Sequence, residues 1–235
     1  MIKKIFCIAA AMLLGISTLS QAASAKPVCV VANSYGVYET KVFINNVFSP
    51  EGNYTYEQKG SAFPVDDLEK YSLVAVFHSA ERPWTSEECS TIQKYLESGG
   101  HLLLGGFAAR NLSKEVGAAN IPWIGIKTVG AGKGAKAEVL KPAHPLLKGV
   151  FDTVTSPEWL ASTYLGVVDS SALEILVGIP ENRVMVGFQK VGKGWVAFLS
   201  LEAFRFKKDM PQEEKDAYYK IFRNIVEMAN TSGEI

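Results

Sequence analysis

Apolar residues gather along the chain in short runs that are separated by polar and glycine-containing stretches. Three runs are almost continuously apolar, which is typical of strands buried on both faces of a parallel sheet. They fall at residues 27–33 (PVCVVAN), 73–78 (LVAVFH) and 101–106 (HLLLGG). The pattern therefore predicts three buried strands in the first half of the chain. Residues 54–57 are a weaker candidate for another strand, and the apolar spacing over residues 36–48 is loosely helical.

A helix is predicted between the second and third buried runs. Thr85 and Glu88 have the spacing of a capping box, in which each side chain bonds the other residue's backbone N–H. Apolar residues then recur on one helical face before the glycine pair at 99–100 ends the helix: Cys89, Ile92, Tyr95 and Leu96. Strand, helix and strand joined by short loops make a right-handed parallel crossover. The first half thus predicts an α/β fold with a doubly wound, flavodoxin-like, mostly parallel sheet.

The second half of the chain has a different pattern. Strand-like segments follow one another at residues 135–140, 173–179, 183–191 and 194–201. The glycines at 192 and 194 lie between the last two segments and indicate a hairpin turn, so we predict an antiparallel extension of the sheet. The apolar stripe of residues 211–229 predicts a final helix that covers one face. Its members are Ala217, Tyr218, Ile221, Phe222, Ile225 and Val226.

The first 25 residues have the pattern of a secretory signal peptide. Lys3 and Lys4 precede an apolar run, and small residues follow it up to Ala23-Ser24-Ala25, an A-x-A cleavage site. We expect a bacterial-type export signal that is cleaved near Ala25, and a periplasmic or secreted mature protein. No convincing linker interrupts residues 26–235, so we predict a single domain there.

Charge and cysteine content narrow the range of partners. The full chain has 24 basic and 24 acidic residues, and loss of Lys3 and Lys4 with the signal leaves a net charge of −2. We therefore expect no nucleic acid partner and, after cleavage, no membrane partner. The mature chain keeps Cys29 and Cys89, whose pairing stays open; two small buried core residues are the favoured interpretation. They are too few for a zinc site, so no metal or other cofactor is expected.

The glycine-rich stretch VGAGKGAK at residues 129–136 suggests a phosphate-binding loop at first sight. In that motif a serine or threonine follows the lysine, but Gly134 follows Lys133 here. The position of the motif's first glycine holds Lys127. We therefore interpret the stretch as a loop without a nucleotide-binding role.

Three segments carry a resemblance to a known family. The order of elements over residues 71–106 resembles that of the class I glutamine amidotransferase-like superfamily. AHPLLKGV at 143–150 and VGKGWVAFLSLEAF at 191–204 resemble two segments of its ThuA-like, trehalose-utilisation branch. The resemblance implies the flavodoxin-like amidotransferase fold, and the association of the ThuA-like branch with carbohydrate metabolism implies a carbohydrate or a derivative as the ligand.

The chain departs from the amidotransferase pattern where the chemistry would lie. Amidotransferases of this class carry a nucleophilic cysteine at the turn after the third buried strand, but that turn reads GGFAARN here, with Phe107 and Ala108. The histidine expected late in the chain is also missing, since Glu202 and Ala203 stand in that segment. Glutamine hydrolysis through a thioester is therefore not expected. The ThuA-like branch also lacks that cysteine.

Candidate site residues follow the predicted ends of parallel strands, where open α/β sheets bind their ligands. His78 is a candidate general acid or base, and Glu158 and Glu202 are a candidate carboxylate pair of the kind that glycoside hydrolysis uses. The alternative is a histidine bonded to backbone and carboxylates in ordinary ion pairs. The candidate ligand-binding residues are Asn33, Tyr35, Glu81, Arg82, Phe107, Arg110, Asn111 and Trp159.

The sequence is compatible with three functions. The first is a small-molecule binding domain without amidotransferase activity, for which a carbohydrate ligand is implied by the resemblance. The second is a sugar-acting enzyme that uses His78 with Glu158 or Glu202. The third is an accessory subunit that binds a protein partner, for which an exposed apolar patch is expected. A fold alone does not choose among them.

Overall fold

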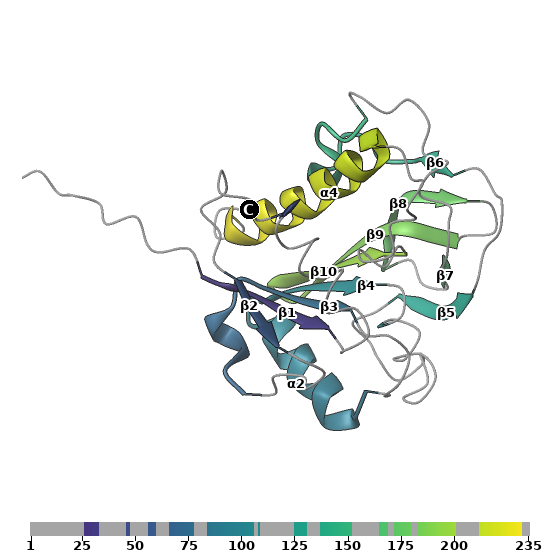
Figure 1. The fold of residues 1–235 in the computed structure, drawn as a ribbon. Helices are drawn as coiled ribbons and strands as arrows, with labels where there is room; N and C mark the ends of the chain where they lie inside the picture. The colour runs from purple at the N-terminus through teal and green to yellow at the C-terminus, as the bar shows by residue number, and fades with distance from the viewer. Residues whose placement is uncertain are drawn as a thin grey trace, which may run out of the picture.

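A single mixed sheet with helices on both faces organises the chain (Figure 1). In the computed structural model α4 (Gln212–Thr231) lies over one face and α2 (Ser86–Glu97) over the other. The structure describes residues 26–32, 46–47, 56–59, 66–77, 84–105, 108, 125–130, 137–151, 165–168, 172–179, 183–200 and 212–231. The predicted signal segment 1–25 lies outside these residues.

Five neighbouring strands of the sheet run parallel. They are β2 (Tyr56–Lys59), β1 (Val28–Ala32), β3 (Leu73–Phe77), β4 (His101–Gly105) and β10 (Gly194–Leu199), in that order across the sheet. This is the 2-1-3-4-5 order of flavodoxin-like sheets, with β10 in the fifth place. The three buried strands predicted from sequence are confirmed, and the weaker candidate at 54–57 is found as β2, shifted by two residues.

The continuous apolar runs are explained by burial on both faces. Val28 and Val30 of β1 pack in the core on the α4 side, whereas Cys29 and Val31 pack on the α2 side. Side chains of a strand alternate between the two faces of a sheet, so a strand covered on both needs apolar residues throughout. All six members of the predicted stripe on α4 are buried in the core on the α4 side of the sheet.

The predicted capping box is present at the start of α2. Thr85 Oγ1 accepts a hydrogen bond from the backbone N–H of Glu88 at 3.1 Å, and the Glu88 carboxylate accepts one from the backbone N–H of Thr85 at 2.8 Å. The helix ends where Gly99 adopts a φ of 109°, a conformation that favours glycine. The predicted helix boundaries are therefore confirmed, together with the buried face that includes Ile92 and Leu96.

An antiparallel extension continues the sheet beyond β10, as predicted. β9 (Arg183–Val191) pairs with β10 as a hairpin, and β8 (Glu174–Ile179) pairs with β9. Two further strands, β7 (Leu165–Val168) and β5 (Ile126–Gly130), were not predicted. The interpretation of residues 129–136 as a loop is wrong for Val129 and Gly130, which belong to β5. The predicted strand at 135–140 is only the short β6 (Glu138–Val139).

Both cysteines of the described chain are core residues. Cys29 is fully buried in β1 and Cys89 is buried on α2, and no disulfide joins the two. The favoured interpretation of two small buried residues is therefore confirmed. The described part of the chain also contains no helix that combines the length and the apolar character needed to cross a membrane.

Candidate functional site

The carboxyl ends of four parallel strands lie level with one another at one edge of the sheet. Ala32, the last residue of β1, pairs with Phe77, the last residue of β3. Val76 pairs with Leu104, so Phe77 is level with Gly105 at the end of β4. Gly105 in turn pairs with Leu199, the last residue of β10. The loops that leave these four strands therefore start from adjacent positions along one edge.

The sequence places most candidate site residues in the segments that leave this edge. Asn33 comes directly after Ala32, His78 directly after Phe77, and Glu202 three residues after Leu199. The candidates themselves lie outside the described residues, so their side-chain positions stay predictions: Asn33, Tyr35, His78, Glu81, Arg82, Phe107, Arg110, Asn111, Glu158, Trp159 and Glu202. The structure does describe the strands that precede these candidates, with the exception of Glu158 and Trp159.

The order of strands reverses between β1 and β3. The connection from β1 to β2 passes through residues 46–47, which lie on the α4 side, because Arg223 of α4 donates a hydrogen bond to the carbonyl of Asn46 at 2.6 Å. The connection from β3 to β4 contains α2, which lies on the other face. Connections that diverge to opposite faces leave a crevice at the carboxyl ends of the strands, and this is where ligands of such sheets bind.

Phe77 and Gly105 mark the end of the sheet at this edge. The Phe77 side chain is buried on the α4 side, with its ring 5.9 Å from that of Phe222 on α4. Gly105 on the neighbouring strand has no side chain that would displace this ring. At this edge an aromatic contact therefore closes the core between the sheet and α4.

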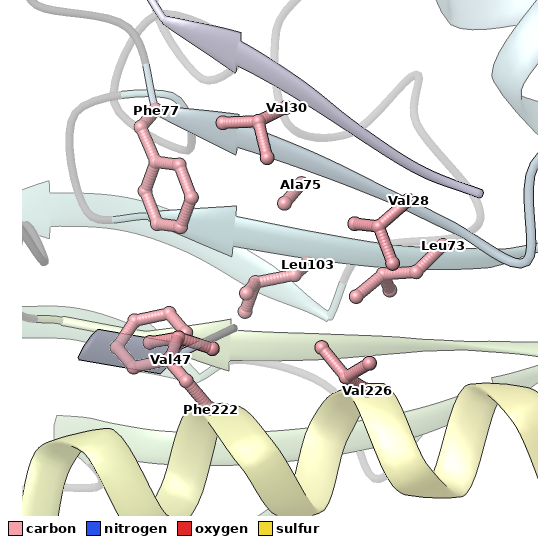
Figure 2. Close-up of a pocket in the computed structure, with 9 residues that line it drawn as sticks. All are labelled: Val28, Val30, Val47, Leu73, Ala75, Phe77, Leu103, Phe222 and Val226. Atoms are coloured by element: carbon pink, nitrogen blue, oxygen red, sulfur yellow. The ribbon is translucent and has the colours of Figure 1, made fainter. Parts of the chain in front are cut away.

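A cavity lies behind this contact, between the sheet and α4 (Figure 2). Figure 2 shows side chains of β1, β3 and β4 directed toward Phe222 and Val226 of α4, with Val47 beside them. The lining is entirely apolar, and the volume open to the centre of a water molecule is about 10 Å³. A bound water needs at least this volume and two or more polar partners. The cavity is thus a dry packing gap of the core, unsuited to a carbohydrate.

The two thiols are unsuited to nucleophilic chemistry. Burial, together with the charge of neighbouring Glu88, raises the pKa of Cys89 to about 11. The thiolate is the reactive form of cysteine, so little of it is present near neutral pH. Cys29 is fully buried within β1. At the turn that holds the nucleophile in amidotransferases, the described residue Ala108 is buried in the core on the α2 side.

Two other residues of types common in binding sites, His144 and Trp84, have structural roles. His144 precedes the short 3₁₀ helix η4 (Pro145–Leu147), and its Nδ1 accepts a hydrogen bond from the backbone N–H of Leu146 at 3.2 Å. Its ring also packs on that of Phe188, with 4.8 Å between ring centroids. His144 therefore shapes the turn that leads into η4. Trp84, just before α2, is 4% exposed and packs in the core beside that helix.

His101 is a buried titratable residue that the sequence analysis did not single out. It is the first residue of β4, 5% exposed, and its ring stacks on Trp195 of β10. It lies at the amino end of β4, so it is remote from the edge with the candidate residues. Across the described ranges, His, Cys, Asp and Glu side chains do not gather into a group of three that could hold a metal ion.

Comparisons of the whole chain with solved structures agree on the fold. A cytoplasmic protein of Salmonella typhimurium superposes with a TM-score of 0.62 at 12% identity, over 86% of this chain and 98% of that protein. A Bacteroides uniformis protein described as ThuA-like gives a TM-score of 0.59 at 12% identity, over 87% and 93% of the two chains. Neither a protein-family model nor the sequence of a curated protein matches the chain.

The fold also matches a protein described as an enzyme subunit and a part of a larger enzyme. A Thermoplasma acidophilum protein described as a subunit of GMP synthase matches with a TM-score of 0.50 at 12% identity, over 88% of this chain and 96% of that one. A β-galactosidase from Bacillus circulans matches with a TM-score of 0.55 at 11% identity, over 86% of this chain but 31% of the galactosidase. The chain has a class I glutamine amidotransferase-like fold. Within that class its fold resembles that of ThuA-like proteins, which confirms the resemblance stated from sequence.

Proposed function

We propose that this protein binds a small polar molecule, of the carbohydrate class, at the carboxyl edge of β1, β3, β4 and β10, and that it does not hydrolyse glutamine. The observation that carries the proposal is the level ending of these four strands on either side of the β1–β3 reversal. Neighbouring strands are about 4.8 Å apart, so loops that begin on them start close together. Asn33 and His78 begin two such loops.

The carbohydrate class is supported by two likenesses. The segments at 143–150 and 191–204 resemble the ThuA-like branch, and the fold resembles that of a β-galactosidase region. Sugars present hydroxyl groups and apolar ring faces, which suit polar side chains beside aromatic ones. The proposed contacts are Asn33, Tyr35 and Trp159, with Glu81, Arg82, Phe107, Arg110 and Asn111 around them.

A ligand screen with matched variants tests the proposal. The thermal unfolding of the mature chain is measured with neutral sugars, sugar acids and amino acids. A binder at 100 times its dissociation constant adds about 2.7 kcal/mol to the free energy of unfolding. We expect the His78→Ala and Trp159→Ala variants to lose most of this gain, and Lys193→Ala, an exposed turn residue at the opposite edge, to keep it.

The outcomes separate the proposals from one another. Stabilisation by a sugar that survives both site substitutions would move the site away from these residues. No stabilisation by any ligand in the panel would count against a small-molecule function. Binding of a partner protein without any such ligand would then favour the accessory subunit. Among the described residues a single large apolar side chain is exposed, that of Leu140, so no exposed apolar patch there supports this alternative.

A sugar-acting enzyme is the second candidate, favoured by the position of His78 directly after a level strand end. Glycosidases hold two carboxyl groups about 5 to 10 Å apart, depending on mechanism. In this proposal Glu158 and Glu202 supply those groups, or one of them works with His78. Release of a chromophore from aryl glycosides by the wild type, lost in Glu202→Gln, would establish catalysis. A bound sugar that is never turned over would assign the site to binding alone.

Export is a further part of the proposal. The basic start, apolar run and A-x-A sequence support cleavage between Ala25 and Lys26. Expression of the full chain in a bacterial host, followed by fractionation and mass spectrometry, should give a periplasmic or secreted product that begins at Lys26. An uncleaved chain in the cytoplasm would contradict this part and leave the binding proposal intact.

A further inference from the structure

His101 and Trp195 form a stacked pair at the amino ends of β4 and β10. The two residues are register partners in the parallel pair, and their rings lie 4.5 Å apart between centroids with an angle of 11° between planes. Trp195 belongs to the core that α4 covers, together with Met228 and Ala229 from the last turns of that helix. The pair therefore lies on the face of the sheet that α4 covers.

The His101 ring lies where a second N–H group would have no hydrogen-bond acceptor among the described residues. Its Nδ1 atom is buried and has no hydrogen-bond partner among the described residues, and the side chain is 5% exposed. A neutral imidazole has one N–H donor and one acceptor nitrogen, whereas both nitrogens of the charged form are donors that require acceptors or water. A charged ring at this position would leave a donor unsatisfied in the core, which is costly.

The surroundings of His101 also disfavour a positive charge. Burial, in part opposed by the backbone of Gly100, lowers the pKa of His101 to about 4, and the charge of Lys26 lowers it further. No carboxylate of the described chain offsets these effects. α2 reaches the residue through the Tyr95 hydroxyl, which donates to the His101 carbonyl at 3.4 Å. Met228 and Ala229, which the last turns of α4 contribute to the core shared with Trp195, are apolar. The other histidine of the described residues, His144, lies beyond Phe188 and Trp195 in the same aromatic row.

We propose that His101 is an acid-sensitive latch: as a neutral ring stacked on Trp195 it keeps the amino edge of the sheet packed under the end of α4, and its protonation releases that packing. The geometry of the pair is the basis of the proposal, which is independent of the ligand site at the opposite edge. Acid would loosen the last turns of α4 and the starts of β4 and β10 before the rest of the sheet.

The direction of the pH effect follows from linkage. The folded chain binds a proton at His101 only near pH 4, whereas the unfolded chain binds one near 6.5, the ordinary value. The contribution to stability is therefore complete above pH 6.5, is lost progressively as the pH falls from 6.5 to 4, and changes little below that. Relative to neutral pH, this loss decreases the folding equilibrium constant about 30-fold at pH 5 and on the order of 100-fold at pH 4.

Denaturant unfolding of the mature chain from pH 7 to pH 4 tests the latch. His101→Phe keeps an aromatic ring and cannot be protonated. Its folding equilibrium constant should therefore fall less than that of the wild type between pH 7 and pH 4, by about 30-fold at pH 5 and on the order of 100-fold at pH 4. The control is His144→Asn, because asparagine also serves at the start of a helix while the second imidazole is removed. It should retain most of the wild-type pH dependence.

Two measurements on the wild type keep the proposal independent of the folding of the variant. NMR titration of the His101 ring should give a midpoint well below 6, and a midpoint at or above 6 would overturn the proposal. Hydrogen exchange, corrected for its intrinsic pH dependence, should rise first in residues 225–231 and 194–196 on acidification. First opening elsewhere, or a His101→Phe variant with unchanged pH dependence, would also overturn it.

Discussion

A Cβ atom added at Gly105 would lie 2.8 Å from the Cδ1 atom of Phe77 on the neighbouring strand. The Phe77 ring is buried and packs near Phe222 of α4, so its displacement disturbs the contact between sheet and helix. We expect Gly105→Ala to lower the free energy of unfolding by about 1–3 kcal/mol through overpacking. Urea denaturation measures the loss.

A double-mutant cycle checks that the loss comes from this pair. Phe77→Leu removes the ring and should make Gly105→Ala less costly than it is in the wild type. Equal costs of the Gly105 substitution in both backgrounds would show that Phe77 is not the group that is displaced.

Gly194 makes a closer approach at the opposite edge of the sheet. A Cβ atom there would lie 1.9 Å from the carbonyl oxygen of Gly100 and 2.7 Å from that of Leu96. These are backbone atoms that cannot rotate away, so Gly194→Ala should cost about 3 kcal/mol or more. Lys193→Ala, an exposed neighbour in the same turn, should change stability by less than about 0.5 kcal/mol. Similar melting temperatures for the two variants would contradict the tight contact.

The capping box at α2 gives a smaller and separable effect. Thr85→Ala removes the acceptor for the backbone N–H of Glu88 and should cost about 1 kcal/mol. Thr85→Ser keeps a hydroxyl acceptor and should retain most of that stability. Chemical denaturation of the three proteins gives the comparison, and an equal loss in Ser and Ala would mean that the hydroxyl does not cap the helix.

Asn224 ties α4 to the segment that contains η4. Its side-chain amide donates hydrogen bonds to the carbonyls of Leu146 at 3.0 Å and Lys148 at 2.9 Å, and the residue is buried. Asn224→Ala leaves both carbonyls without this donor and should cost about 2 kcal/mol. Glu227→Ala, on the exposed face of the same helix, is the control. Unfolding midpoints that agree between the two variants would rule out the proposed tie.

The sequence predicted those parts of the fold that depend on residues close together in the chain, such as apolar runs, helix caps and short turns. The runs that became β1, β3 and β4 had to be apolar throughout because both faces of the sheet are covered. The capping box fixes the start of α2 through contacts within one turn. The β9–β10 hairpin was visible because its glycine-containing turn is short, and Gly192 has a φ of 59°.

The missed strands depend on pairing that is remote in sequence. β5 and β7 pair with each other across a separation of more than thirty residues, and the irregular register between them includes a bulge at Ile126–Thr128. β5 is only five residues long and ends in glycine, so its local pattern favoured a loop. The place of β10 between β4 and β9 likewise reflects long-range pairing. Sequence predicted a strand there but not its parallel neighbour.

Sequence reasoning about the site identified strand ends rather than contacts. Asn33 and His78 were selected because each follows an apolar run, and the structure shows that those runs end side by side at Ala32 and Phe77. The residues that touch a ligand depend on loop conformations that no periodicity encodes. His101 was passed over because a histidine that opens an apolar strand gives no local sign of how deeply its ring is buried.

The level strand ends give this scaffold a division of labour. Ala32, Phe77, Gly105 and Leu199 are held in place by backbone pairing, which does not depend on the identity of the residues that come after them. Each outgoing segment can therefore lengthen, shorten or change its side chains without shifting the anchor of its neighbour. Proteins on this framework can differ widely in the molecules they recognise while they keep one and the same platform beneath the binding loops.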